Sequence, residues 1–213
     1  MARKQRQRYF LADGTEVPGV TTILEVINKP ALVRWANQEG LKGIDTSRSV
    51  GDLALVGTLA HSLIQAHLTG GNADLNDYTP AQVSRADNAV LAYLDWEKPR
   101  TLETEKAEQP MVSEALAYGG TPDWFGRIDG RWVLLDFKTS KAIYDDHVFQ
   151  LSAYWNMLVE QDYQVDEARI LRVGRQPNEG FEERVVPAES LPMYFEVFKA
   201  ALKLRNAIQM VPK

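Results

Sequence analysis

The stretch GTPDWFGRIDGRWVLLDFKTS, residues 120–140, decides more about this chain than any other segment. Two runs rich in aromatic and β-branched residues flank Asp129-Gly130, and this dipeptide between such runs is a strong signal for a tight hairpin turn. We therefore predict that a strand over Trp124–Asp129 pairs with a strand over Arg131–Phe137, which continues toward Lys138.

Two acids and a lysine come together in this hairpin. Strand side chains alternate between faces, so Asp136 and Lys138 share one face and Phe137 takes the other. Asp123 precedes the partner strand and comes close to Asp136 if the hairpin pairs in simple register. Two carboxylates and an ammonium group at one place suit a hard divalent cation and a developing oxyanion. This combination is typical of phosphodiester hydrolysis.

The same residues allow a plainer interpretation. Asp136 follows an apolar run, where an unpaired carboxylate is costly, and an ion pair with a lysine would remove that cost without a metal. Lys138, taken alone, is compatible with a solvated strand end. The presence of Asp123 upstream favours the metal interpretation. In that interpretation Asp136 holds the cation, while Lys138 orients the attacking water and stabilises charge on the phosphate.

Composition sets the limits for every interpretation of the motif. The 213 residues are 45% apolar and 25% charged, as is usual for one globular domain. The absence of cysteine excludes disulfides, thiolate zinc sites, a cysteine nucleophile and an iron–sulfur cluster. The net charge of −5 is unlike that of a protein that coats nucleic acid, although cations neutralise a carboxylate-rich metal site locally.

The N-terminal segment and the hydropathy bear on location. No apolar run approaches the roughly 20 residues needed to span a bilayer, so no membrane association is expected. Residues 1–8 are basic but lack a following signal-type apolar core, which makes a cytoplasmic location the natural expectation. The basic residues are interpreted either as a disordered tail or as an arm that touches phosphate.

Periodicity predicts an α/β chain with a sheet and packed helices. Residues 19–24 fit a short strand or a helix entry, with Thr21 or Thr22 as the N-cap. We expect a single domain, 1–213, in which 1–108 is mainly helical and 109–213 forms the sheet core with the metal site. Helices are predicted from Pro30, over Asp52–Leu68, Pro80–Glu97, Asp145–Glu160 and Ser190–Met210, and strands over Met111–Ala117, Trp124–Asp129, Arg131–Phe137, Arg169–Val173 and Glu182–Val186.

The histidines differ in their positions. His61 lies on the flank of the apolar stripe of the 52–68 helix, where a side chain can face a cleft, although a lone helical histidine is usually structural. His67 is expected to be a partly buried structural residue. The two are six residues apart, so they point too far apart around the helix to bind one ion together. His147 has no partner at ligand spacing and is expected at the surface.

Other polar residues are candidates for substrate contact. Gln150 and Tyr154 are four residues apart on one helix and therefore share a face, as they would also in an ordinary amphipathic helix with a polar edge. Arg127 and Arg131 flank the hairpin turn. Contact with phosphate is one interpretation of them, and charged hairpin ends are common without it.

The ordered set of motifs resembles the PD-(D/E)xK nuclease superfamily, in particular its RecB-like exonuclease branch, which is found in bacteriophages and among mitochondrial genome-maintenance exonucleases. Any one of these motifs is weak evidence, whereas the set in the family's order is strong. The matching stretches are GVTTIL at 19–24, GTLAH at 57–61, the glutamate of SEALAY at 113–118, GGTPD at 119–123, LLDFKTS at 134–140, and Gln150 with Tyr154.

The resemblance implies a restriction-endonuclease-like fold, in which helices flank a central mixed sheet. It implies Mg²⁺ or Mn²⁺, one or two ions, and no iron–sulfur cluster. By similarity, the implied metal ligands are His61, Asp123, Asp136 and the Phe137 carbonyl, with Glu114 less firmly. Lys138 would be the catalytic lysine, with Gln150 and Tyr154 lining the site near the substrate backbone; Thr139 and Arg127 complete the candidate substrate contacts.

The function implied is that of a metal-dependent DNA exonuclease acting in phage recombination or replication, or in DNA repair. One alternative is an endonuclease of the same fold, junction-resolving or restriction-type, which generally needs an added region for base readout. The other is a catalytically silent nucleic-acid-binding module, which the presence of Lys138 and both acids disfavours. DNA is the expected partner, and an annealing protein and an oligomer are suggested by analogy alone.

Overall fold

The structure, a computed structural model, describes residues 7–212. Of the basic N-terminal segment, residues 1–6 lie outside this range. The helices are α1 (Val20–Leu24), α2 (Pro30–Leu41), α3 (Thr46–Thr69), α4 (Pro80–Glu97), α5 (Asp145–Glu160) and α6 (Leu191–Met210), with a 3₁₀ turn at Ala188–Ser190. The strands are β1 (Tyr9–Phe10), β2 (Glu16–Val17), β3 (Leu102–Ala107), β4 (Met111–Ser113), β5 (Tyr118–Gly120), β6 (Trp124–Ile128), β7 (Arg131–Lys138), β8 (Glu167–Val173) and β9 (Phe181–Pro187).

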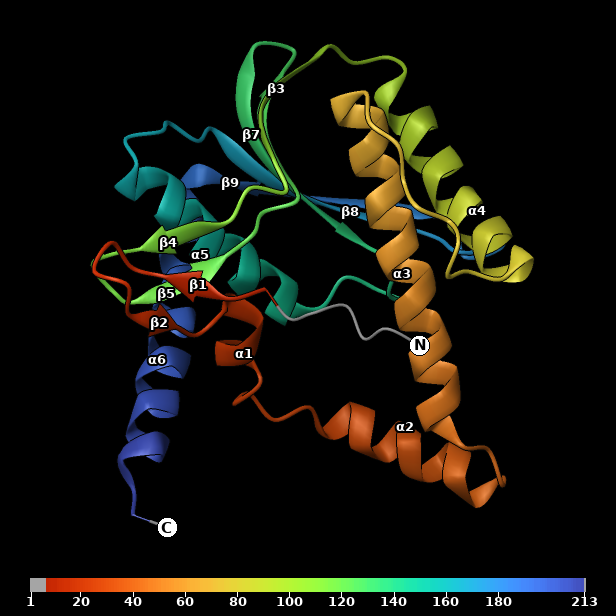
Figure 1. The fold of residues 1–213 in the computed structure, drawn as a ribbon, viewed down its shortest axis with the longest axis horizontal. Coiled ribbons are helices and arrows are strands. Elements are labelled where there is room, and N and C mark those ends of the chain that lie inside the picture. Colours follow the sequence, from red (N-terminus) through yellow and green to blue (C-terminus); the bar gives the residue numbers. More distant parts are fainter. Residues whose placement is uncertain (1–6, 213) are drawn as a thin grey trace.

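A five-stranded mixed sheet runs through the centre of the molecule in the order β3-β6-β7-β8-β9 (Figure 1). The β7–β8 pair is parallel, because α5 connects these two strands, and the other neighbours are antiparallel. Two small hairpins, β1–β2 and β4–β5, lie outside this sheet. The prediction of a central mixed sheet flanked by helices is confirmed.

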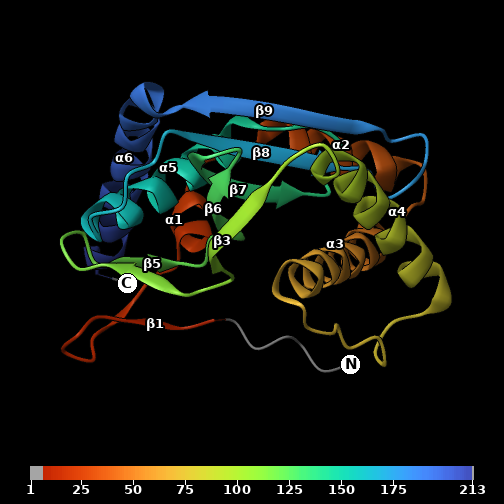
Figure 2. The same cartoon turned by 90° about the horizontal axis from the view of Figure 1, so that it is seen from above.

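Helices cover both faces of the sheet and create two separate hydrophobic cores (Figure 2). One core joins α1, α5 and α6 to the sheet residues Leu134 and Ile170. The other joins α3 and α4 to Val133, Leu135 and Phe137. Alternate residues of β7 thus face opposite layers, and this places Asp136 and Lys138 on the α5 side, as alternation requires.

The sheet begins earlier than the sequence pattern predicts. Its edge strand is β3, which lies inside the region predicted to be helical. Of the predicted strand Met111–Ala117, only Met111–Ser113 is a strand, β4, and residues 114–117 form the turn to β5. In this turn the Leu116 N–H donates a hydrogen bond to Ser113 Oγ at 3.1 Å, and Ala117 has a positive φ of 54°. The charged sequence of β3, LETEKA, conceals it because an exposed edge strand needs no apolar alternation.

The helix ends follow local capping rules. Residues 20–24 form a helix, and its N-cap is Gly19 rather than Thr21 or Thr22. Helix α3 starts before the predicted Asp52, since Asp45 caps it by accepting a hydrogen bond from the Ser47 N–H, and it ends at Gly70 in the left-handed conformation. Among the described residues, no helix combines the length and apolar character needed to cross a membrane.

Candidate active site

The β6–β7 pairing brings the two predicted acids together. Trp124 pairs with Leu135, so Asp123 lies opposite Asp136 immediately beyond the last pair, as the simple register predicts. The Phe137 N–H donates to Asp123 Oδ2 at 2.6 Å, which fixes the Asp123 side chain across the gap between the strands. The carbonyl of Asp123 accepts a hydrogen bond from the Glu108 N–H at 3.1 Å, so the end of β3 is attached to the same point.

Lys138 lies between an acid and an amide. Its Nζ is 2.5 Å from Asp136 Oδ2 and donates a hydrogen bond to Gln150 Oε1 at 3.0 Å. Gln150 Nε2 in turn donates to the Tyr154 hydroxyl at 2.8 Å, so helix α5 holds the lysine through a chain of side chains. Asp136 is only 1% exposed. Its Oδ2 is in contact with the charged Lys138 ammonium, but it accepts no hydrogen bond of ordinary geometry from the residues that the structure describes.

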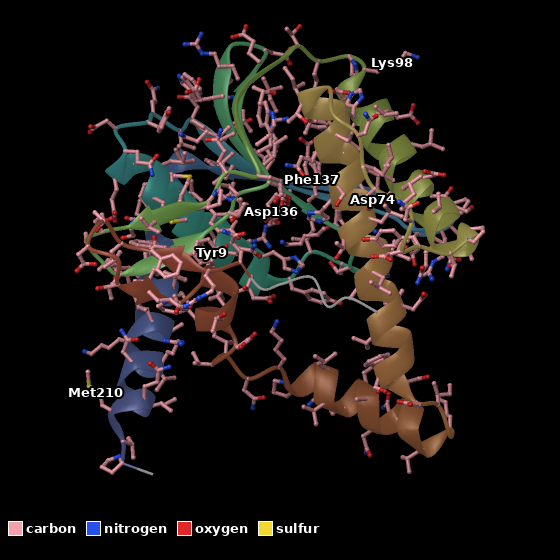
Figure 3. The ribbon with its side chains drawn as sticks, in the orientation of Figure 1. Tyr9, Asp74, Lys98, Asp136, Phe137 and Met210 are labelled. Atoms are coloured by element: carbon pink, nitrogen blue, oxygen red, sulfur yellow. The ribbon has the colours of Figure 1, made fainter. Side chains whose placement is uncertain are left out.

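His61 reaches the acids from the opposite layer. It projects from α3, and its Nδ1 lies 3.3 Å from Asp123 Oδ1. Its ring meets the ring of Phe137 edge-on, with 6.1 Å between the ring centres. A Cβ on Gly57 would lie 2.8 Å from Thr139 Oγ1, so the missing side chain lets α3 approach the end of β7 closely. Figure 3 shows Asp136 and Phe137 at this junction of sheet and α3.

Glu108 joins His61 and Asp123 in a group that can hold a cation. One ligand atom from each of the three lies within 4.8 Å of the others. An imidazole nitrogen with carboxylate oxygens suits Mn²⁺, and the carboxylates suit Mg²⁺, so the donors present fit the expected ion. Asp136 does not belong to this group in the structure, because its carboxylate is directed at Lys138.

The sequence pattern does not identify Glu108 as a candidate ligand, and the predicted ligand Glu114 lies outside the group. Glu114 is exposed on the β4–β5 turn, where its Oε1 accepts a hydrogen bond from the Ala12 N–H at 2.9 Å. The structure therefore places Glu108, rather than Glu114, beside the predicted ligands. Recognition of strand β3 would have identified Glu108. Because Ala107 at the end of β3 pairs with Trp124 at the start of β6, the next residue, Glu108, lies beside Asp123.

Burial and charge shift the proton affinities of these groups. Burial lowers the pKa of His61, but the Asp123 carboxylate outweighs it and the pKa lies above its ordinary value. Burial raises the pKa of Asp123, yet His61 and then Lys138 hold that pKa below its usual value. Burial raises the pKa of Asp136 to about 6 against the influence of Lys138. His61 would have to be deprotonated to bind a cation, so any metal binding at this group would be accompanied by proton release.

Tyr154 fits the site because its neighbour has no side chain. A Cβ on Gly120 would lie 2.5 Å from Tyr154 Cε1, so the glycine of the GGTPD motif makes room for the ring. Burial raises the pKa of Tyr154 well above its ordinary value, so its hydroxyl keeps its proton. The neighbouring Thr121 Oγ1 lies 3.1 Å from the hydroxyl of Tyr9, which ties the β1–β2 hairpin to this motif.

Three other predicted residues lie apart from the group. Arg127 is near the turn end of β6, at the opposite end from Asp123, and its guanidinium stacks over the Trp132 ring at 4.6 Å. His67 Nε2 contacts Glu97 at 2.6 Å, and its side chain is 44% exposed, more than the predicted partial burial. His147 is partly exposed, as a surface position allows, but it is not free of contacts: its Nδ1 accepts from the Tyr144 N–H at 3.2 Å, and burial, then Lys138, lowers its pKa to about 4.

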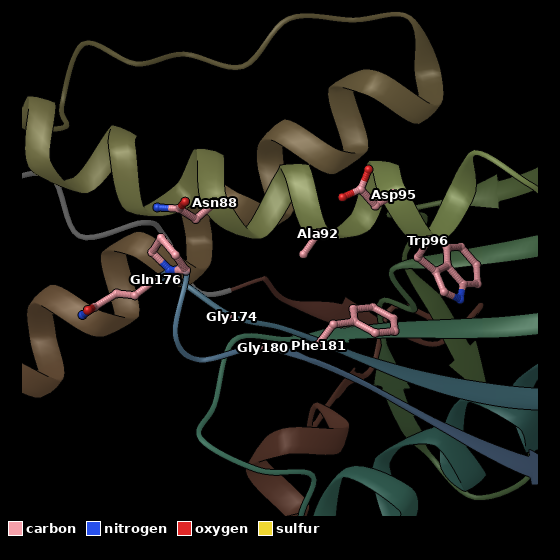
Figure 4. Close-up of a pocket in the computed structure, with 9 residues that line it drawn as sticks. Asn88, Ala92, Asp95, Trp96, Gly174, Gln176, Gly180 and Phe181 are labelled. Atoms are coloured by element: carbon pink, nitrogen blue, oxygen red, sulfur yellow. The ribbon is translucent and has the colours of Figure 1, made fainter.

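Two hollows border the site. One, of about 280 Å³, is lined by His61, Glu108 and Thr139, and the other, of about 500 Å³, reaches Gln150 from the α1–α2 side. A third hollow, of about 420 Å³, lies between α4 and the turn that joins β8 to β9 and includes Trp96 and Phe181 (Figure 4). The third contains none of the predicted site residues.

No protein-family model and no curated protein matches the sequence. Solved structures with a similar course of the chain include an alkaline exonuclease from Laribacter hongkongensis, 12% identical, with 92% of this chain and 95% of that chain covered and a TM-score of 0.40. The structure of the same enzyme in complex with dAMP gives a TM-score of 0.37. A candidate exonuclease from Eubacterium rectale is 13% identical, with 71% and 68% covered and a TM-score of 0.44. Such low scores carry no functional argument.

Proposed function

We propose that this chain is a metal-dependent DNA exonuclease that hydrolyses phosphodiester bonds. The observation that supports it most is the meeting of Asp123, Asp136 and Lys138 at the open end of the β6–β7 pair. His61 from α3 and Glu108 from the end of β3 complete the group. Acidic ligands on one side and a buried lysine on the other are what hydrolysis of a phosphodiester requires.

The metal ligands in this proposal come from helix α3 and from the strands of the central sheet or the residues next to them. His61, Asp123, Asp136 and the Phe137 carbonyl are the proposed ligands, with Glu108 as an addition from the structure. The ion proposed is Mg²⁺ or Mn²⁺, as one or two ions. When bound, such a cation polarises the phosphoryl oxygen and lowers the pKa of a coordinated water.

Lys138 serves as a cation and not as a base. Burial lowers its pKa, but Asp136 and then Asp123 reverse this effect and raise it, so the ammonium keeps its proton. A protonated lysine stabilises negative charge on the phosphate and orients the attacking water. Gln150 positions that ammonium group, and Tyr154 positions Gln150.

We place the chain in the PD-(D/E)xK superfamily within the same proposal, on the ordered motifs and on the positions of their residues. Thr139 remains a proposed substrate contact, whereas the position of Arg127 at the far end of the hairpin offers no support for that role. A part in phage recombination, replication or DNA repair, an annealing partner, an oligomer and a cytoplasmic location stay proposals that the resemblance suggests.

The test is degradation of end-labelled linear DNA beside a closed circle, with Mg²⁺, Mn²⁺ or EDTA. We expect that only the linear DNA is degraded, and only in the presence of a metal ion. In Lys138→Ala the rate of this degradation should fall by a factor of at least about 10², as it does when one group that stabilises transition-state charge is removed. Lys141→Ala, at an exposed position three residues later, is the matched control and should keep full activity. Cutting of the circle would favour an endonuclease, and binding without cleavage would favour a silent module.

A further inference from the structure

The hollow beside Gln150 separates the α1–α2 connection from the start of α5. It measures about 500 Å³, within the range of small-ligand sites. Gln150 forms part of its wall and also accepts the hydrogen bond from Lys138, so the hollow borders the candidate site. The lining residues are Thr21, Leu24, Glu25, Ile27, Asn28, Lys29, Leu32, Val33, Asp146 and Gln150.

One wall of the hollow is apolar and exposed. Leu32 and Val33 of α2 are 55% and 67% exposed, and Leu24 and Ile27 continue the wall toward the protein interior. Helix α2 makes few contacts with the rest of the molecule, and a helix of this length is marginal in water without packing. A ligand against Leu32 and Val33 would therefore bury apolar surface that the fold leaves open.

The other lining residues of the hollow are mostly polar and carry both signs of charge. Lys29 Nζ lies 2.6 Å from Asp146 Oδ2, and Asn28, Thr21 and Glu25 complete the polar set. Two carboxylates here disfavour a phosphate inside the hollow. A long hydrocarbon chain is equally unsuited, because it would cover the Lys29–Asp146 pair without compensation. A flat group with apolar faces and polar edges suits a lining that combines apolar and polar side chains.

We infer that this hollow receives the base of one unpaired nucleotide next to the scissile phosphate. The inference rests on the proposed function and deepens it. The phosphate lies at Lys138, Gln150 marks the boundary, and the base lies against Leu32 and Val33 with its edge toward Asn28 and Thr21. A base stacked in a duplex has both faces covered, so the nucleotide must be unstacked before it enters.

The test uses end-labelled single-stranded DNA with one abasic nucleotide, a tetrahydrofuran, placed at successive positions. With the wild-type protein and Mg²⁺ or Mn²⁺, we expect cleavage to slow at a single register relative to the abasic position. The expected factor is roughly fivefold, at the lower end of what one bound base contributes because this hollow has no aromatic side chain. The wild-type experiment needs no substitution, so a misfolded variant cannot obscure it.

Variants of the apolar wall provide the second measurement. The double variant Leu32→Ala/Val33→Ala should cleave normal DNA roughly fivefold more slowly and show no further loss at the abasic position. Leu91→Ala, at an exposed apolar position on α4, is the control and should behave as wild type. The inference would be overturned if wild type cleaved equally at every abasic position. It would also be overturned if the Leu32→Ala/Val33→Ala variant still showed slower cleavage at one register. Absence of any cleavage by wild type would instead contradict the proposed function.

Discussion

Glu108 and Glu114 are two acidic residues close in sequence to the candidate site, and the motif and the structure favour different ones as the metal ligand. The carboxylate of Glu108 lies with His61 and Asp123, whereas that of Glu114 binds the backbone of Ala12. The motif resemblance alone favours Glu114. Geometry favours Glu108, since metal ligation requires the donor atoms to converge.

The two positions can be compared by substitution. Glu108→Gln should raise the Mg²⁺ concentration for half-maximal DNA cleavage on the order of tenfold or more, since even outer-shell partners of metal sites contribute that much. Glu114→Gln should leave it within about twofold, as is usual for an exposed position. Metal titrations of nuclease activity measure both. The opposite ranking of the two variants would restore Glu114 as the ligand.

The positions of the two acids and the lysine could be predicted from the sequence, because they depend only on short-range features of the chain. Asp136 and Lys138 share a face because strand alternation is fixed, and Asp123 lies opposite Asp136 because the hairpin turn fixes the register. Glu108 could not be found in this way. Its position depends on pairing between β3 and β6, and no tight turn joins these two strands, since β4 and β5 lie between them in the chain.

At the scale of elements, strand β5 packs directly against helix α5 at Gly120, which contacts the ring of Tyr154. A Cβ there would lie 2.5 Å from Tyr154 Cε1 and 3.1 Å from Val20 Cγ2, so alanine must displace the ring or the strand. Gly120→Ala should lower the free energy of unfolding by about 1–3 kcal/mol, as overpacking of a core does. It should also reduce cleavage, because Tyr154 holds Gln150 and Gln150 holds Lys138.

Urea unfolding and DNA cleavage measure the two effects in parallel. Gly51→Ala is the matched control, because Gly51 lies within α3 and an added Cβ there meets nothing within 4 Å. That change should be neutral or stabilising by up to about 1 kcal/mol, as is usual for glycine to alanine in a helix. Equal stability of the Gly120 variant and wild type would show that β5 and α5 are not packed as described.

The elements themselves were predictable to different degrees. The amphipathic helices α4 and α5 match their predicted bounds because each buries one apolar stripe. The edge strand β3 has no such stripe, and its charged residues face solvent. The segment 111–117 looks like one strand because its residue types favour strands, but the Ser113 side chain and the left-handed Ala117 break it into a hairpin.

For the whole molecule, the candidate site lies where the two layers meet at one end of the sheet. His61 comes from the α3–α4 layer, and Gln150 and Tyr154 come from the α5 layer. Only the folded chain brings His61, Glu108 and Asp123 together, so a cation held by these three residues would bind the native state alone. Such binding would stabilise the fold by mass action, and we expect the apparent melting temperature to rise with metal concentration.

The most direct measurement of the central claim is calorimetric titration of the protein with Mn²⁺ in the absence of DNA. Wild type should bind one or two ions and release protons, while Asp123→Asn should lose this binding by at least about tenfold. Asp87→Asn, at an exposed position on α4, is the control and should bind as wild type does. If Asp123→Asn binds Mn²⁺ as tightly as wild type, these residues do not form a metal site and the account is contradicted.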